Sequence, residues 1–192
     1  MSRKLEFFYD YVSTYSYLAN SQVAKIKADV VYRPMFLGGV MKATGNSPPL
    51  TVKAKGTYLN KDVARWVDRY SIPFRMNPNF PQNTVNALRL ALLAQREGCF
   101  DVVHQALFDA MWVHDKDLSD PACLAEIGTG AGMSASTLED IGTDSIKDEL
   151  RSNTDEAISR GAFGAPTFYV GDEMFFGNDR FEFIREALEN RG

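Results

Sequence analysis

Hydrophobic side chains form short continuous runs near both ends of the chain and recur at helical spacing in between. Residues 5–9 and 30–35 are apolar or β-branched runs of strand length. Residues 16–28, which lie between them, have the period of a helix. A strand, a helix and a second strand in this order predict a β-α-β unit with parallel strands and a right-handed crossover.

The C-terminal segment returns to strand-like sequence. Residues 167–170 and 173–176 are β-branched or aromatic runs separated by Gly171 and Asp172, a pair that indicates a hairpin turn. A helix is predicted over residues 179–189. The two ends of the chain together therefore supply the β-α-β and β-β-α parts of one α/β domain.

The middle of the chain is mostly helical. Helices are predicted over residues 61–70, 84–97 and 100–113, after Asp120 and Pro121, and over 136–160 with a break near 141–143. Residues 37–58 are rich in Gly and Pro and are predicted to be irregular. The expected architecture is a thioredoxin-like fold with an inserted all-helical domain: residues 1–38 and 161–192 form the thioredoxin-like domain, and 39–160 the helical insertion.

Composition and charge limit the classes of binding partner that the protein is expected to have. The 192 residues carry a formal net charge of -4 without a basic run, which argues against nucleic acid or an anionic membrane and favours a small molecule. Cys99 and Cys123 stand apart in apolar helical contexts without metal-ligand spacing, so we expect structural thiols and no metal. No secretory h-region or membrane-length apolar run is seen. We therefore expect a cytoplasmic protein.

The most informative motif follows the first strand, where Ser13 and Ser16 open a helix with Ser-x-x-Ser spacing. A thioredoxin-like protein carries Cys-x-x-Cys at this point, and the unpaired N–H groups and dipole of a helix N-terminus favour a thiolate. The sequence therefore predicts an external thiolate, with glutathione as its donor and Ser13 as the hydroxyl beside it. Helix capping by either serine explains the same residues.

A serine hydrolase needs a base near its nucleophile. The histidines, His104 and His114, both lie in the helical insertion, and the Gly-x-Ser-x-Gly pattern of hydrolases is missing. We therefore expect a structural or surface role for each histidine.

Two further segments could meet the Ser13 turn. Pro166 begins a strand, and a cis-proline at this place in thioredoxin-like folds faces the active turn, leaving the backbone of Ala165 free to pair with a peptide. A trans proline that merely starts the strand is the alternative. Asn178 and Asp179 precede the last helix, where they are expected to cap it or to hold a γ-glutamyl group.

Together these segments resemble the 2-hydroxychromene-2-carboxylate isomerase family, relatives of the kappa-class glutathione transferases within the DsbA-like thioredoxin superfamily. The resemblance spans nearly the whole chain and rests on Phe8-Tyr9-Asp10 with Ser13, residues 15–19, Asn46 with Pro48 and Pro49, Pro73-Phe74, Phe80-Pro81 with Asn83 and Thr84, residues 164–168, and Phe176-Gly177 with Asp179 and Arg180.

The resemblance implies roles for individual residues. It implies that Ser13 lies beside the glutathione sulfur, that Ala165 pairs with the tripeptide backbone next to Pro166 in the same cofactor site, and that Asn178 and Asp179 hold the γ-glutamyl end. The family usually has proline where this chain has Thr14, so the turn lacks a fixed φ angle.

The implied reaction is isomerisation of a hydroxychromene carboxylate to a hydroxybenzylidene pyruvate in aromatic degradation, with glutathione as cofactor. The substrate carboxylate needs a cationic or amide partner, and Lys42, Asn46, Lys53 and Arg89 are the candidates; solvated surface is the alternative for the lysines. Glutathione conjugation of electrophiles and a non-catalytic, thioredoxin-like peptide-binding module are the other functions considered. A homodimer is expected from the family.

Overall fold

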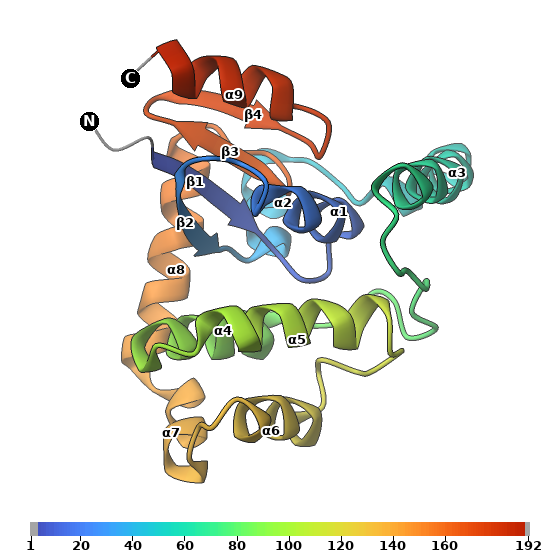
Figure 1. Cartoon of the computed structure of the whole chain (residues 1–192). Coiled ribbons are helices and arrows are strands. Elements are labelled where there is room, and N and C mark those ends of the chain that lie inside the picture. The colour runs from blue at the N-terminus through green and yellow to red at the C-terminus, as the bar shows by residue number, and fades with distance from the viewer. Residues whose placement is uncertain (1–3, 191–192) are drawn as a thin grey trace.

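A four-stranded mixed sheet forms the centre of the protein in the computed structural model, which describes residues 4–190 (Figure 1). Strand β1 (Lys4–Tyr9) pairs in parallel with β2 (Asp29–Pro34) and antiparallel with β3 (Thr167–Val170), which pairs antiparallel with β4 (Glu173–Phe176). The strand order is β2-β1-β3-β4. The predicted α/β, thioredoxin-like fold with its C-terminal hairpin is confirmed.

Helices connect and cover this sheet. They are α1 (Thr14–Val23), α2 (Leu37–Thr44), α3 (Lys53–Tyr70), α4 (Val85–Glu97), α5 (Phe100–Trp112), α6 (Pro121–Gly130), α7 (Ala135–Glu139), α8 (Asp144–Ser159) and α9 (Phe181–Asn190), with 3₁₀ turns at Pro49–Thr51 and Asp140–Gly142. No helix within residues 4–190 is long and apolar enough to cross a bilayer.

Strand β1 supplies side chains to two apolar clusters because its residues alternate between the faces of the sheet. Phe7 and Tyr9 belong to a large cluster that continues through Leu88 of α4 to Trp112 of α5. Phe8 points to the other face, where it joins a smaller cluster with Val40 of α2. The sheet and the helical layer therefore share one continuous core. The proposed division into two domains stays a prediction.

Helix α8 packs against both layers. It contacts β2 and α2 beside the sheet and α4 in the helical layer. Figure 1 shows it running along one side of the molecule from the sheet to the helices below. Helices α2, α4 and α8 therefore meet close to the end of the sheet where β1 and β2 finish.

The prediction that residues 37–58 are irregular is wrong. Helix α2 runs through Gly38 and Gly39, where the Phe36 ring lies so close that a Cβ on Gly38 would come within 2.7 Å of it. Gly45 then ends the helix with a left-handed φ of 71°. Helix α3 begins at Lys53, eight residues before the predicted start at 61. Tertiary packing outweighs the low helix propensity of glycine here.

The first helix also differs from its prediction. It begins at Thr14 and ends at Val23, whereas the hydrophobic pattern extended it to residue 28. Ser13 occupies the N-cap position. The sequence signal for the start was therefore the first serine of the Ser-x-x-Ser pair.

Candidate functional site

Ser13 lies at the turn between β1 and α1, and both sides of its hydroxyl group are engaged. Its Oγ accepts a hydrogen bond from the Ser16 backbone N–H at 3.1 Å and donates one to the Ala165 carbonyl at 3.0 Å. The backbone N–H of Ser13 is fixed by the Asp10 carbonyl at 3.0 Å. Ser13 therefore caps α1, as one of the two interpretations predicted, and also faces the segment before Pro166.

The Ala165–Pro166 peptide bond is cis, which is one of the two alternatives that the sequence left open. The carbonyl of Pro166 accepts a hydrogen bond from Gly177 N–H at 3.1 Å, which holds this loop against the end of β4. Residues separated by 152 positions thus meet in the Ser13–Ala165 hydrogen bond. The structure brings Ser13, Ala165 and Pro166 together.

Asn178 and Asp179 precede α9 and connect it to α3. Tyr70 Oη donates to the Asn178 carbonyl at 2.9 Å, and the Asn178 side-chain amide lies 3.5 Å from the same hydroxyl. Asp179 pairs with Arg180 at 2.6 Å. The first helical hydrogen bond of α9 is accepted by Arg180, so the prediction that Asn178 and Asp179 cap this helix is wrong.

Between α1 and α3, beside the Ser13 turn, lies a groove of about 400 Å³. It is lined by Tyr15, Pro49, Ala54, Lys55, Tyr58 and Leu59. Tyr15 Oη donates to Asp62 at 2.8 Å, and burial together with the charges of Asp62 and Asp179 raises the pKa of Tyr15. The Tyr15–Asp62 hydrogen bond therefore ties α1 to α3 beside this groove.

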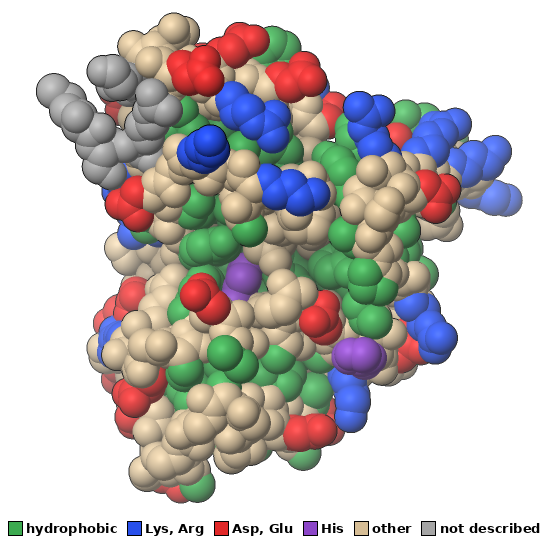
Figure 2. Space-filling view, in the orientation of Figure 1, with side chains coloured by type: hydrophobic (Ala, Val, Ile, Leu, Met, Phe, Trp, Pro, Cys, Tyr) green, Lys and Arg blue, Asp and Glu red, His purple; other side chains and the backbone are tan. Residues whose placement is uncertain are grey.

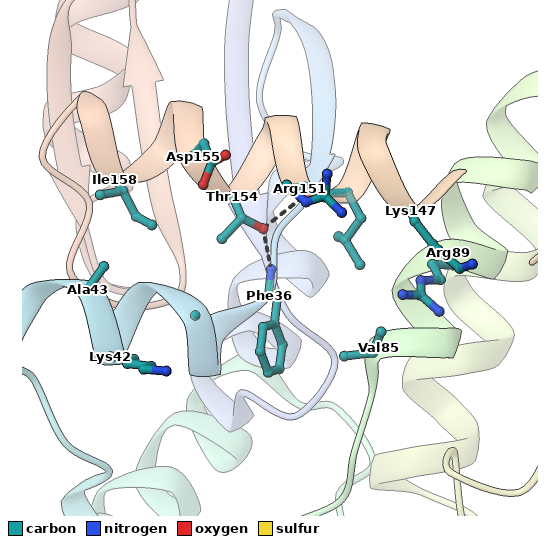
Figure 3. Close-up of a pocket in the computed structure, with 12 residues that line it drawn as sticks. Phe36, Lys42, Ala43, Val85, Arg89, Lys147, Arg151, Thr154, Asp155 and Ile158 are labelled. Atoms are coloured by element: carbon teal, nitrogen blue, oxygen red, sulfur yellow. Dashed lines mark hydrogen bonds between the residues drawn. The ribbon is translucent and has the colours of Figure 1, made fainter. Parts of the chain in front are cut away.

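The four candidates for the substrate carboxylate separate in space. Lys42 and Arg89 line one larger cavity of about 670 Å³ between α2, α4 and α8 (Figure 3). Asn46 donates its side-chain amide to the Phe163 carbonyl at 2.8 Å. Lys53 is exposed at the start of α3 and lines neither cavity. The structure thus brings together two of the four residues.

Two further cations line this cavity, Lys147 and Arg151, and neither was among the predicted site residues. They stand one helical turn apart on α8, where charged side chains are ordinarily part of a solvated face. Only the meeting of α8 with α2 and α4 gives them a common cavity. No local signal in the sequence could have found them.

Beneath the Ser13 turn, Asp10 is fully buried and collects hydrogen bonds from three segments. Its carboxylate accepts from the backbone N–H of Val12 at 3.1 Å and of Leu37 at 2.9 Å, and from the Thr84 hydroxyl. Burial raises the pKa of Asp10, and these donors oppose the rise. The start of α2 and the start of α4 are therefore both tied to the turn that carries Ser13.

His104 is buried under the same turn. Its Nδ1 lies 2.9 Å from Tyr11 Oη and its Nε2 lies 2.9 Å from Asn20 Oδ1, so the ring accepts from the tyrosine and donates to the amide oxygen. Burial lowers the pKa of His104 to about 3. This histidine is therefore neutral and structural, as expected, and His114 is exposed.

Cys99 and Cys123 are free thiols, one half-buried and the other buried. Over residues 4–190 no group of three or more His, Cys, Asp or Glu side chains is arranged to hold a metal ion.

A family model for the DSBA-like thioredoxin domain matches residues 4–189. The 2-hydroxychromene-2-carboxylate isomerase of Pseudomonas sp. (strain C18) is 32% identical, with 96% of this chain and 89% of that protein aligned. Glutathione S-transferase kappa 1 of Rattus norvegicus is 30% identical over 97% of this chain and 91% of its own. A solved structure of a 2-hydroxychromene-2-carboxylate isomerase superposes with a TM-score of 0.88 at 27% identity, covering 98% of this chain and 95% of that one.

Proposed function

Because this chain belongs to the DSBA-like thioredoxin domain family, we propose that it is a glutathione-dependent enzyme that isomerises 2-hydroxychromene-2-carboxylates to hydroxybenzylidene pyruvates. The observation that carries the proposal is the Ser13 hydroxyl, which caps α1 and lies 3.0 Å from the Ala165 carbonyl beside cis-Pro166. Ser13 stands where redox-active thioredoxin-like proteins keep a cysteine, so the sulfur has to come from a bound thiol. The relatives named as isomerases and as kappa-class transferases support the same choice.

The residues around Ser13 fit a tripeptide with two carboxylates and one ammonium group. Helix α3, which forms one wall of the groove, carries five Lys and Arg side chains, and Lys55 among them lines the groove. Lys and Arg side chains gather over α3 in the space-filling view (Figure 2). The half-exposed Asp179 carboxylate supplies the opposite charge for the ammonium group. Asn178 is almost fully buried against Tyr70 and therefore positions this loop.

Glutathione held beside Ser13 would supply a nucleophilic thiolate that can add to a conjugated carbon of the substrate and leave it again. Ser13 favours the ionised sulfur by donating its hydroxyl hydrogen, which now points to the Ala165 carbonyl. Its Oγ already accepts from Ser16 N–H, which polarises the O–H bond and makes it a better donor. The N-terminus of α1 adds its partial positive charge.

Calorimetry and ultraviolet absorbance test this role of Ser13. Wild-type protein is expected to bind glutathione and to show thiolate absorbance in the complex. Ser13→Ala should still bind the tripeptide, but it should lose the absorbance and about 100- to 1000-fold of the isomerase activity, the usual cost of removing one donor to a reacting anion.

Ser21→Ala is the matched control for this experiment. Ser21 lies on the same helix, and its hydroxyl donates to the Leu18 carbonyl away from the site. This variant should behave like the wild type. Absence of glutathione binding to the wild-type protein at millimolar concentration would contradict the proposed function.

Conjugation of electrophiles is the second candidate, because the rat kappa-class transferase is nearly as similar as the isomerases. Both reactions use the same thiolate, and they differ in whether the adduct is released as product. Following free thiol during turnover separates them: a constant thiol concentration supports the isomerase, and steady loss supports the transferase. We further propose that the protein acts in the cytoplasm, which keeps glutathione reduced. A homodimer is proposed from the family resemblance alone.

A further inference from the structure

The cavity between α2, α4 and α8 has an aromatic wall. Phe36 stands at its centre in Figure 3, with 38% of its surface exposed. The ring lies against Gly38 and Gly39, where any side chain would meet it. Val85, Leu150 and Ile158 extend the apolar lining. A flat apolar molecule can therefore stack or pack here with little rearrangement.

The same cavity is lined by four cations and one carboxylate, although the chain as a whole has a net charge of -4. Lys147 and Arg151 pair with Asp144 and Asp148 on the exposed face of α8. Within residues 4–190, Lys42 and Arg89 have no carboxylate at ion-pair distance. The buried Nε of Arg89 has no partner there either.

The two unpaired cations lie on opposite sides of Phe36. Lys42 comes from α2 on one side of the ring, and Arg89 comes from α4 on the other, near Lys147 (Figure 3). A guanidinium group binds a carboxylate with two parallel hydrogen bonds, whereas an ammonium group acts as a compact donor. The arrangement therefore suits an aromatic ligand with a carboxylate at one end and a hydroxyl oxygen at the other.

The Asp10 carboxylate connects this cavity to the Ser13 turn. Phe36 precedes Leu37, and Val85 follows Thr84; Leu37 and Thr84 both donate hydrogen bonds to Asp10. Asp10 in turn accepts from Val12, the neighbour of Ser13. The Phe36–Val85 end of the cavity is thus held at a fixed position relative to the turn.

We propose that this cavity binds the aromatic ligand of the reaction in its ring-opened form, the hydroxybenzylidene pyruvate, with Arg89 receiving its carboxylate, Phe36 its ring and Lys42 the phenolic oxygen that ring opening frees. The proposal rests on the proposed function for the identity of the substrate. The cavity itself can be tested without glutathione or turnover, because its lining does not include Ser13.

Fluorescence titration with three probes tests the assignment: 2-naphthoate, 6-hydroxy-2-naphthoate and the uncharged 2-naphthamide. Arg89→Gln is expected to weaken both acids by about 10- to 100-fold, the loss of a charge-assisted hydrogen bond, and to leave the amide unchanged. Lys42→Gln should weaken only the hydroxy acid, by about 3- to 10-fold. The matched control Arg185→Gln, on exposed α9, should change none of the three.

Two outcomes overturn the assignment: equal binding of 2-naphthoate by wild type and Arg89→Gln, or an unchanged KM for the chromene substrate in Arg89→Gln. Arg89→Lys, which keeps the charge, should recover part of the binding and so exclude misfolding as the cause. If the wild-type protein binds 2-naphthoate but not glutathione, the cavity assignment stands and the proposed function is wrong. If the wild-type protein isomerises the substrate and Arg89→Gln does so equally well, the proposed function stands and the cavity assignment is wrong.

Discussion

The turn between β1 and α1 has a buried side and a side that faces the cis-Pro166 segment, which we call the cleft side, and the two differ in what their polar groups contact. On the buried side, Asp10 and the Tyr11–His104 pair bond only to groups of the protein interior. On the cleft side, the Ser13 hydroxyl donates to a backbone carbonyl that sits beside cis-Pro166. The difference shows that the hydroxyl facing the cis-proline segment stands on a fixed polar base, which is how a preorganised site is supported.

Removing the buried carboxylate should have the largest effect. Asp10→Ala leaves the N–H groups of Val12 and Leu37 and the Thr84 hydroxyl without their acceptor, at a cost of about 3–5 kcal/mol in the free energy of unfolding. Urea denaturation measures this cost. Asp148→Ala, at an exposed ion pair, is the control and should change stability by less than about 1 kcal/mol. A loss for Asp10→Ala as small as the control's would mean that the buried side does not anchor the turn.

Lowering the pH should reduce the free energy of unfolding through His104, on the buried side of the turn. Burial lowers the pKa of His104 from 6.5 to about 3, so between these values the unfolded chain binds a proton that the folded protein excludes. The free energy of unfolding should therefore fall by about 1.4 kcal/mol for each pH unit below about pH 6.

His104→Gln isolates this contribution, because an amide side chain can still accept from Tyr11 and donate to Asn20 without titrating. Urea denaturation at pH 7 and pH 5 should show a shallower pH dependence for the variant. Equal slopes would show that the histidine becomes charged in the folded state, which would erase the contrast between the two sides of the turn.

Loss of the cleft-side hydroxyl should affect stability much less than it affects chemistry. Ser13→Ala removes an N-cap, which costs about 1 kcal/mol, and leaves the buried Ala165 carbonyl without its donor, which adds about 1 kcal/mol. Ser134→Ala is the matched control, since Ser134 caps α7 with the same kind of bond to Thr137 N–H at 3.1 Å. Thermal unfolding should show Ser13→Ala less stable than Ser134→Ala by about 1 kcal/mol, the share of the Ala165 hydrogen bond. A loss as large as that of Asp10→Ala would instead place the hydroxyl in the structural base.

Local sequence signals were enough for the strands, the hairpin and the Ser13 turn. Each depends on neighbours along the chain: apolar runs for β1 and β2, and a Gly-Asp pair between β3 and β4. Helix α2 was missed because its glycines oppose helix formation, and only the burial of Leu37 and Val40 and the Phe36 ring stabilise it.

The candidate site was predictable to the same extent. Ser13, Ala165 and Pro166 carry local signals, and the fold brings them together. The role of Asp10 was not visible, because its partners Leu37 and Thr84 are 27 and 74 residues away. The same holds for Lys147 and Arg151, which join Lys42 only through the packing of α8 against α2. The sequence alone does not show which distant segments pack against one another.

The second serine of the motif provides the smallest and most discriminating prediction. Ser16 is fully buried, and its Oγ has no hydrogen-bond partner within residues 4–190. Ser16→Ala removes an unsatisfied hydroxyl and improves helix propensity, so it should stabilise the protein by up to about 1 kcal/mol in urea denaturation. Ser21→Ala, which removes a satisfied hydroxyl from the same helix, should instead destabilise it slightly. Because Ser16 exposes no surface, Ser16→Ala should leave the glutathione thiolate absorbance unchanged, and a loss of that absorbance would assign the ligand-facing role to both serines rather than to Ser13 alone.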